Sequence, residues 1–364
     1  MTKIIISGGG TGGHVYPAIA IANALKKADK DIDILFVGAK GKLEMEKVPK
    51  AGYPIKGLWI SGFHRKLTLR NLMFPLKLLV SLFRSIGIVR RFKPDVVVGV
   101  GGYASGPLLE IATRKGIPCL VQEQNSYPGI TNRLLAKKVD KICVAYEGLE
   151  RWFPKNKITL TGNPVRADLI KARDKRLEGI KHFGFDPGRK TIFLTGGSLG
   201  ARSLNNSMSG SLDLLKRDDV QVLWQSGKLY IDEFEPKVAD LPNVKITAFV
   251  DRMDLAYAMA DVVIARSGAS TISELCMVGK PSILVPSPNV AEDHQTANAK
   301  SLVEKGAAIL VADKDAPKEM VSRALKLMNQ KEELENLSKN IRELAKPNAS
   351  DEIAREVLAL VKTK

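Results

Sequence analysis

The sequence is poor in cysteine and histidine, and this excludes several kinds of site. Its 364 residues include three cysteines and four histidines. No two cysteines form a CxxC pair, and no histidines show zinc-ligand spacing such as HExxH. Two D-x-D triplets, Asp31–Asp33 and Asp313–Asp315, are interpreted as chance clusters of surface charge. We therefore expect reduced thiols, no disulfide framework, no metal site and no cofactor.

Long apolar runs are also absent. No uninterrupted run approaches the ~20 residues that a membrane-spanning helix needs. Met1–Lys3 leads directly into the strand-like Ile4–Ile6, unlike a signal peptide. Because 45% of the residues are hydrophobic, the chain can bury large cores, and its length predicts about two domains.

Acidic residues are missing from one long stretch. The net charge is +17, and Lys47–Pro94 contains lysines and arginines but no aspartate or glutamate. A one-sided charge of this kind predicts a polyanionic partner, either nucleic acid or an anionic membrane surface.

Within this stretch, Pro75–Phe92 is predicted to be an amphipathic helix. Its apolar positions are Leu76, Leu79, Phe83 and Ile86, and its basic positions are Lys77, Arg84 and Arg91. The helix is either a crossover helix packed on a sheet with a solvated outer face, or a helix lying on an anionic membrane. The two interpretations are compatible.

The remaining pattern is apolar strands that end in glycine loops and are followed by helices, which predicts an α/β fold. Lys3–Ser7 precedes Gly8–His14, and Lys190–Thr195 precedes Gly196–Arg202. We interpret this repetition as two Rossmann-like domains, residues 1–163 and 164–348, that face one cleft. The final helix, about residues 349–364, is a candidate to pack back onto the first domain.

The stretch Asp261–Gln295 reads as strand, glycine turn, helix and strand. Ligands bind beyond the carboxyl ends of parallel strands, and the amides of a helix start suit a phosphate. Glu274, early in this helix, could accept hydrogen bonds from both hydroxyls of a ribose. The alternative is an ordinary βαβ unit in which Glu274 is a solvated helix residue.

The first glycine loop fits the dinucleotide pattern G-x-G-x-x-G at Gly8, Gly10 and Gly13. The acidic residue that such a site needs at the end of the second strand is missing, because Val37 is followed by Gly38 and Ala39. This absence argues against a nicotinamide or flavin site. The loop remains suited to an anion, because it opens a helix.

One titratable side chain in this loop, His14, is a candidate general base. A helix start disfavours imidazolium, which keeps the ring neutral and able to accept a proton. Alternatively, His14 binds a diphosphate or caps the loop. Glu123, in the polar cluster Gln122–Asn125 after another predicted strand, is the rival base.

The ordered motifs resemble one known family over nearly the whole chain. They are Gly9–His14, Gly102–Pro107, Glu123–Asn125, Gly162–Arg166, Gly196–Arg202, Arg266–Glu274 and Asp293–Asn298. Together they are similar to the MurG family, bacterial enzymes that move N-acetylglucosamine from UDP onto undecaprenyl-diphosphate-N-acetylmuramoyl-pentapeptide during peptidoglycan synthesis.

The resemblance implies a GT-B fold and an inverting, metal-independent hexosyltransferase on the cytoplasmic face of the inner membrane, with no nucleic acid as partner. The positions that it implies for UDP-N-acetylglucosamine are Thr11, Gly12, Gly13, Asn125, Arg166, Ser198, Val250, Ala269, Ser270, Thr271, Ile272, Ser273, Glu274 and Gln295. We assign Gly10, Tyr103 and Ser105 to the acceptor side.

Two features depart from the family pattern: Leu199 replaces a common glutamine, and Phe63–Lys66 forms a longer, more basic loop. Three alternatives remain open. These are a UDP-sugar transferase acting on another lipid, a UDP-N-acetylglucosamine epimerase of the same fold, and a non-catalytic basic protein that binds membrane or nucleic acid.

Overall fold

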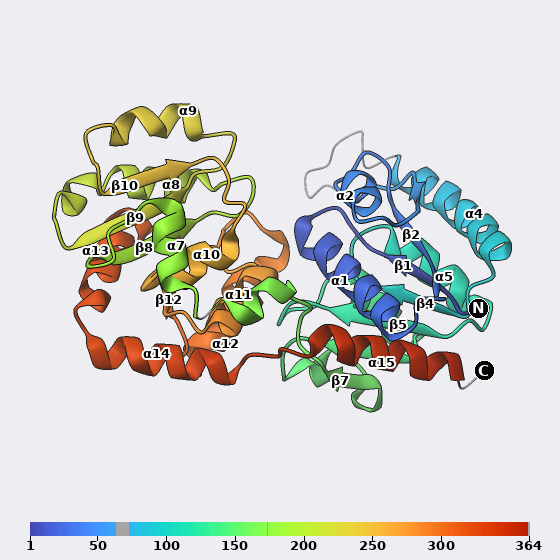
Figure 1. Ribbon diagram of the computed structural model, residues 1–364. Coiled ribbons are helices and arrows are strands. Elements are labelled where there is room, and N and C mark those ends of the chain that lie inside the picture. The colour runs from blue at the N-terminus through green and yellow to red at the C-terminus, as the bar shows by residue number, and fades with distance from the viewer. Residues whose placement is uncertain (63–72, 173, 363–364) are drawn as a thin grey trace. The chain divides into compact units, whose positions relative to one another are not determined.

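The computed structural model describes residues 1–62, 73–172 and 174–362, which form two compact units (Figure 1). Unit 1 comprises Met1–Val165 and the chain from Asn348 onward, and unit 2 comprises Arg166–Pro347. The chain thus leaves unit 1 after Val165 and returns to it for its last helix. The predicted loop Phe63–Lys66 lies outside the described residues.

Unit 1 contains, in its described part, a seven-stranded parallel sheet in the order β3-β2-β1-β4-β5-β6-β7. Its strands are β1 (Lys3–Ser7), β2 (Asp33–Ala39), β3 (Ile55–Leu58), β4 (Val96–Gly99), β5 (Cys119–Glu123), β6 (Lys141–Val144) and β7 (Ile158–Leu160). Its helices are α1 (Gly12–Ala28), α2 (Glu44–Lys50), α4 (Phe74–Phe92), α5 (Ser105–Arg114), α6 (Ile130–Leu135) and α15 (Ala349–Lys362). Short 3₁₀ turns are η1 (Leu149–Arg151) and η2 (Lys155–Lys157).

Alternate residues of the strands enter two cores, one on each face of this sheet. Ile5 packs with α4, α5 and α6, whereas Ile4 and Ile6 pack with α1, α2 and α15. Helix α15 lies along α1 (Figure 1) and buries Ile353 and Val357 in this second core. The last helix is therefore an integral part of unit 1.

Unit 2 contains a six-stranded parallel sheet in the order β10-β9-β8-β11-β12-β13. Its strands are β8 (Lys190–Thr195), β9 (Val220–Gln225), β10 (Val244–Thr247), β11 (Val262–Ala265), β12 (Ser282–Leu284) and β13 (Ile309–Leu310). Its helices are α7 (Arg176–Phe183), α8 (Arg202–Ser209), α9 (Ile231–Phe234), α10 (Met253–Met259), α11 (Ala269–Val278), α12 (His294–Val303), α13 (Ala316–Met328) and α14 (Lys331–Glu343). Its 3₁₀ turns are η3 (Ala167–Lys171), η4 (Leu212–Leu215), η5 (Glu235–Val238) and η6 (Ala291–Asp293).

Both sheets share one doubly wound design. The order reverses between β1 and β4 in unit 1, and between β8 and β11 in unit 2. Ligands bind at such switch points, beyond the carboxyl ends of the strands. Both predicted glycine loops follow a strand at a switch point, β1 or β8.

The apolar positions predicted for α4 do not all pack on the sheet. Leu76, Leu79 and Phe83 are 48%, 53% and 72% exposed. The helix instead buries small residues: Ser81 and Ser85 are fully buried, and the Ser81 hydroxyl donates to the Trp59 carbonyl. Small side chains allow close approach of α4, so most of the apolar stripe points outward and only Ile86 contacts the core.

No helix within the described ranges has both the length and the apolar character to cross a membrane.

Candidate active site

The first glycine loop ends where α1 begins. Gly10 has φ +92°, a left-handed conformation that favours glycine. Thr11 caps the helix, and its carbonyl accepts hydrogen bonds from the N–H groups of His14 and Val15, both at 3.1 Å. The N–H groups of Gly12 and Gly13, which open the helix, have no intrahelical partner by geometry. This turn can therefore donate hydrogen bonds to an anionic or hydroxylated ligand.

His14 lies between this loop and the loop after β4. Its Nδ1 is 3.3 Å from the Thr11 hydroxyl. Its ring rests on Gly101, where an added Cβ would come within 2.9 Å of His14 Nε2. Gly101 also has φ +88°, so two independent constraints favour glycine beside the imidazole. The β1 and β4 loops thus hold a half-buried imidazole at the switch point of unit 1.

The loop after β4 corrects one acceptor-side assignment. Ser105 is fully buried, and its hydroxyl donates to the carbonyls of Ser7 (2.8 Å) and Gly101 (3.0 Å). It therefore ties the two loops together and cannot contact an acceptor. Tyr103 is 48% exposed and its ring lies on Gly62, so it remains available to a ligand.

Glu123 is not the loop residue that the sequence suggested. It is the last residue of β5 and is 1% exposed. Oε1 accepts from the N–H of Asn125 (3.0 Å) and from its Nδ2, while Oε2 accepts from the N–H of Gly129 (3.1 Å) and from Asn132 Nδ2 (2.8 Å). Burial raises the pKa of Glu123. With both oxygens occupied, this carboxylate shapes the loop that presents Asn125, and it is no longer a candidate base.

In unit 2, a pocket of about 600 Å³ lies at the carboxyl ends of β8, β11 and β12. It includes two of the predicted donor positions, Thr271 and Gln295. Its lining residues are Gly196, Gly197, Gly200, Ala201, Arg202, Ser203, Asn206, Tyr230, Arg266, Gly268, Thr271, Ser287, Asn289, Gln295 and Asp313. The start of α11 at Ala269 adjoins this lining, which places helix-start amides at its edge.

Arg266 organises this pocket and was quoted in a sequence motif without an assigned role. Its guanidinium donates to the carbonyls of Val285 (3.0 Å) and Pro286 (3.1 Å) and to Asp313 Oδ1 (2.6 Å). Asp313 also accepts from the Ser203 hydroxyl at 2.7 Å. Asp313 is therefore part of a half-buried network, and the interpretation of its triplet as free surface charge is wrong for this residue.

Glu274 lies deeper in α11 than a solvated helix residue would. The hydroxyl of the buried Tyr257 donates to Glu274 Oε2 at 3.0 Å. Burial raises the pKa of Glu274, and the positive charge of Arg166 opposes this rise. One carboxylate oxygen is thus fixed by Tyr257, which leaves a positioned acceptor for a hydroxyl-bearing ligand.

Other predicted donor positions surround the same edge of the sheet. Gln295 Oε1 accepts from the N–H of Ser287 (2.8 Å), and the Gln295 carbonyl accepts from the Ser267 hydroxyl (2.9 Å). The N–H of Val250 donates to Gln225 Oε1 at 2.8 Å. Ser198 is exposed in the loop after β8. All of these residues follow strands of unit 2, as do Ala269–Glu274.

Comparisons with known proteins identify the family. The profile of the glycosyltransferase family 28 N-terminal domain matches residues 4–144, and that of the C-terminal domain matches residues 191–353. A relative from Flavobacterium psychrophilum is 57% identical over 99% of this chain and 98% of its own length. The chain belongs to glycosyltransferase family 28.

The curated relatives share one name. The Flavobacterium protein and one from Cytophaga hutchinsonii, 54% identical over 99% of this chain and 97% of its own length, are each called a UDP-N-acetylglucosamine–N-acetylmuramyl-(pentapeptide) pyrophosphoryl-undecaprenol N-acetylglucosamine transferase. The crystal structure of Acinetobacter baumannii MurG is 28% identical, with a TM-score of 0.79 over 99% of this chain and all of that one. The predicted resemblance to the MurG family and the GT-B fold are both confirmed.

A structure of UDP-GlcNAc 2-epimerase from Neisseria meningitidis also aligns, with a TM-score of 0.70 over 99% of this chain and all of that one. At 16% identity, this likeness shows a shared fold only.

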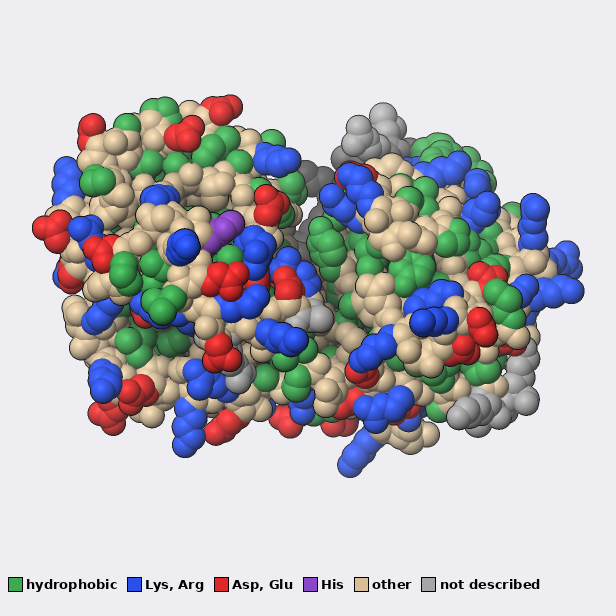
Figure 2. All heavy atoms as spheres, in the orientation of Figure 1, with side chains coloured by type: hydrophobic (Ala, Val, Ile, Leu, Met, Phe, Trp, Pro, Cys, Tyr) green, Lys and Arg blue, Asp and Glu red, His purple; other side chains and the backbone are tan. Residues whose placement is uncertain are grey.

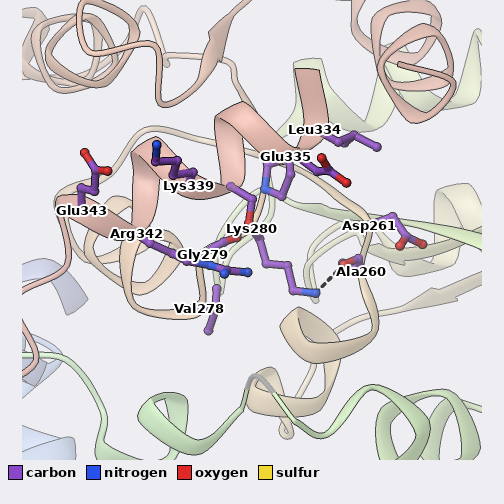
Figure 3. Close-up of a pocket in the computed structure, with 12 residues that line it drawn as sticks. Ala260, Asp261, Val278, Gly279, Lys280, Leu334, Glu335, Lys339, Arg342 and Glu343 are labelled. Atoms are coloured by element: carbon purple, nitrogen blue, oxygen red, sulfur yellow. Dashed lines mark hydrogen bonds between the residues drawn. The ribbon is translucent and has the colours of Figure 1, made fainter. Parts of the chain in front are cut away.

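Family 28 membership leaves a second pocket of unit 2 unexplained. It has a volume of about 630 Å³ and is lined by Ala260, Asp261, Val278, Gly279, Lys280, Pro281, Leu334, Glu335, Ser338, Lys339, Arg342 and Glu343. Lys280 donates to the carbonyls of Ala258 and Ala260, and Figure 3 shows the second of these bonds. The pocket precedes β11 and β12, at the amino ends of strands, and contains none of the predicted site residues.

The cysteines and the candidate metal-ligating side chains of the described residues are arranged as follows. All three cysteines are buried, and burial raises the thiol pKa of Cys143 and Cys276 to about 12. Such thiols are poor nucleophiles at neutral pH. Within those same ranges no three metal-ligating side chains cluster.

Proposed function

We propose that this chain transfers N-acetylglucosamine from UDP-N-acetylglucosamine to the C4 hydroxyl of undecaprenyl-diphosphate-linked N-acetylmuramoyl-pentapeptide. The observation that carries this function is 57% identity, over 99% of the chain, to a relative named for that transfer. The positioned carboxylate of Glu274 and the pocket lined by Thr271 and Gln295 support it.

Unit 2 makes most of the contacts to the nucleotide sugar in this proposal, and Thr11, Gly12, Gly13 and Asn125 of unit 1 remain predicted donor positions. Glu274 accepts hydrogen bonds from the ribose hydroxyls. Its carboxylate is held in place by the Tyr257 hydroxyl, and hydrogen bonds to a carboxylate are stronger than those to a neutral acceptor. The start of α11 and the loop around Ser198 offer backbone amides to the diphosphate. Arg266 acts indirectly, because its hydrogen bonds hold the pocket wall in shape.

Transfer proceeds with inversion when the acceptor hydroxyl attacks the anomeric carbon in line and UDP leaves. His14 accepts the proton of that hydroxyl. General-base help of this kind is worth about 10²–10⁴-fold. The amides at the start of α11 and nearby cationic groups stabilise the charge that develops on UDP. We therefore expect EDTA to leave activity intact.

The acceptor's lipid carrier requires a membrane, and one face of α4 suits an anionic lipid surface. This α4 surface consists of the exposed residues Met73, Leu76, Leu79, Val80, Phe83, Arg84, Arg90 and Arg91. Figure 2 shows hydrophobic side chains beside lysine and arginine side chains where Figure 1 draws α4. Apolar residues flanked by arginines fit the interface between acyl chains and anionic headgroups.

Lys77 does not belong to this surface, although the seven-residue spacing placed it there. Its Nζ donates to the Ser61 hydroxyl (2.9 Å) and lies 5.8 Å from the centre of the Trp59 ring. The long side chain turns back along the helix flank, so only Arg84 and Arg91 of the predicted basic stripe remain free to meet lipid. We place the protein peripherally on the cytoplasmic face of the inner membrane.

One experiment separates the candidate functions. Purified protein is incubated with UDP-N-acetylglucosamine, with and without a short-chain lipid-linked acceptor, and both UDP and the sugar products are measured. We expect UDP release and a disaccharide product only with acceptor. Acceptor-independent conversion of the donor would instead indicate an epimerase, and no UDP release under either condition would indicate a binding protein.

A further inference from the structure

A buried carboxylate lies beneath the first glycine loop. Glu44, the first residue of α2, is 1% exposed. Its Oε2 accepts a hydrogen bond from the Gly10 N–H at 2.8 Å, and its Oε1 accepts one from the Ala39 N–H, also at 2.8 Å. One side chain thus links the loop after β1 to the end of β2.

Two glycines provide the space for this carboxylate. A Cβ at Gly9 would lie 2.1 Å from Glu44 Cδ, and a Cβ at Gly38 would lie 2.4 Å from Glu44 Cγ. Contacts this short are impossible, so any larger residue at either position would displace the side chain. Gly9, inside the first glycine loop, and Gly38, inside β2, therefore make room for an anion that belongs to the protein.

The charge of Glu44 is satisfied by backbone N–H groups, which form stronger bonds to a carboxylate than to a neutral acceptor. A buried carboxylate that lost either bond would be left poorly solvated. The bond to Glu44 holds the Gly10 N–H pointing toward the interior. That N–H is consequently unavailable to a ligand phosphate, and Thr11 follows at the outer side of the turn as the cap of α1.

We propose that Glu44 is a positioning residue for sugar transfer: by holding Gly10 inward, it sets the start of α1 and hence the place of His14. It touches no substrate and acts through the loop. This role rests on the proposed function, in which His14 accepts the proton of the acceptor hydroxyl. A displacement of about 1 Å at such a group can cost about 10²-fold in rate.

The test uses the full chain with Glu44→Gln, which keeps the size of the side chain but replaces one acceptor oxygen with a donor that opposes an N–H. Glu44→Ala is the second variant. Glu46→Gln is the matched control, because Glu46 lies on the same helix but is exposed and pairs with Lys50. We measure thermal unfolding, hydrogen exchange across residues 8–14, UDP affinity by calorimetry, and kcat and KM for both substrates.

We expect folded Glu44→Gln to exchange its Gly10 amide faster and to lose about 10²-fold in kcat, with UDP affinity unchanged within about twofold. Glu46→Gln should match the wild type. A folded Glu44→Gln protein with normal kcat would overturn the proposal. Failure of both Glu44 variants to fold would also overturn it, since the role would then be purely structural. If the wild-type protein transfers no sugar, the proposed function itself fails, whereas normal transfer with an unaffected variant rejects only the role of Glu44.

Discussion

The two glycine loops of this chain look alike in sequence but differ in the charge beside them. The loop Gly8–His14 in unit 1 has the carboxylate of Glu44 beneath it, bonded to the Gly10 N–H. The loop Gly196–Arg202 in unit 2 lines a pocket whose wall is held by the guanidinium of Arg266. One loop lies over a buried carboxylate, and the other adjoins an arginine that is paired with Asp313.

This difference assigns the loops different tasks. In the first loop the Gly10 N–H is already used by Glu44, and the amides that open α1 remain for a ligand. The second loop borders a space of about 600 Å³ next to the start of α11, and helix-start amides suit a diphosphate. A repeated strand–glycine–helix pattern therefore shows where ligands bind, while long-range neighbours decide what kind of ligand each loop accepts.

The largest expected effect is a loss of turnover, without a loss of UDP affinity, when His14 is replaced. His14→Ala should lower turnover at least ~100-fold, because a general base contributes about 10²–10⁴-fold. UDP affinity should change little, because most of the predicted donor positions lie in unit 2. Steady-state kinetics and calorimetry measure the two quantities. His182→Ala, which removes an exposed histidine of α7, is the control. Near-normal turnover in His14→Ala would show that the first loop supplies no base.

The next effect concerns the nucleotide site. Glu274→Ala should weaken UDP-N-acetylglucosamine binding by about 1.5–3 kcal/mol, the range for hydrogen bonds to a charged group. Calorimetry of the folded variant checks this, with Glu343→Ala, an exposed residue of α14, as control. Unchanged affinity would remove Glu274 from the donor site.

The pKa of Glu274 adds a pH dependence to this prediction. Because burial raises that pKa, donor affinity should fall as the pH drops through a value above the ~4.3 of an ordinary glutamate. Folding stability changes in the opposite sense, since the folded state favours the protonated carboxyl and loses stability as the pH rises through the same range. Glu274→Gln should weaken the pH dependence of both donor affinity and folding stability. Calorimetry and urea unfolding of the wild type and the variant, each at a series of pH values, measure the two quantities.

The sequence predicts strands and ligand-facing loops well, for a physical reason. Apolar runs such as Ile4–Ile6 and Val262–Ile264 must be buried, and the glycine turns after them need backbone freedom. Both signals are local. The prediction for Glu274 rested on this information, and the residue lies in α11, the helix that follows β11.

Side-chain partners far apart in the chain could not be predicted. No acidic residue stands between Val37 and Ala39 at the end of β2, but the carboxylate of Glu44, five residues later, turns back and accepts a hydrogen bond from the Ala39 N–H. Glu123 appeared to be a loop carboxylate because its bonds to Gly129 and Asn132 were unknown. For α4, helical spacing defined one apolar stripe, whereas the face that packs combines Ser81 and Ser85 with Val89 and the partly buried Leu78 and Leu82.

The α4 surface belongs to unit 1, and we expect it to give this unit an affinity for anionic lipid. Arg84→Gln with Arg91→Gln should weaken binding to anionic vesicles by roughly 1 kcal/mol per residue, and rising salt should do the same. Turnover of a soluble short-chain acceptor should be retained. Vesicle sedimentation and kinetics measure these effects. Lys77→Gln is the informative control, because Lys77 bonds Ser61 and should affect vesicle binding less. An equal loss of turnover and vesicle binding in the double variant would mean that the arginines support the fold.

The smallest expected effect is in the second glycine loop, where Leu199 replaces a common glutamine. Leu199 is 70% exposed, next to loop residues that line the pocket of Thr271 and Gln295, so an amide could be placed there without disturbing a core. Leu199→Gln should tighten UDP-N-acetylglucosamine binding by about 0.5–1.5 kcal/mol, the value of one neutral hydrogen bond, and should change stability by less than about 0.5 kcal/mol. Leu229→Gln, at a residue that is 71% exposed, controls for the general effect of replacing a surface leucine. If Leu199→Gln binds the donor no better than Leu229→Gln, the loop contacts the donor through its backbone alone, and the comparison of the two loops then depends on Glu44 and Arg266.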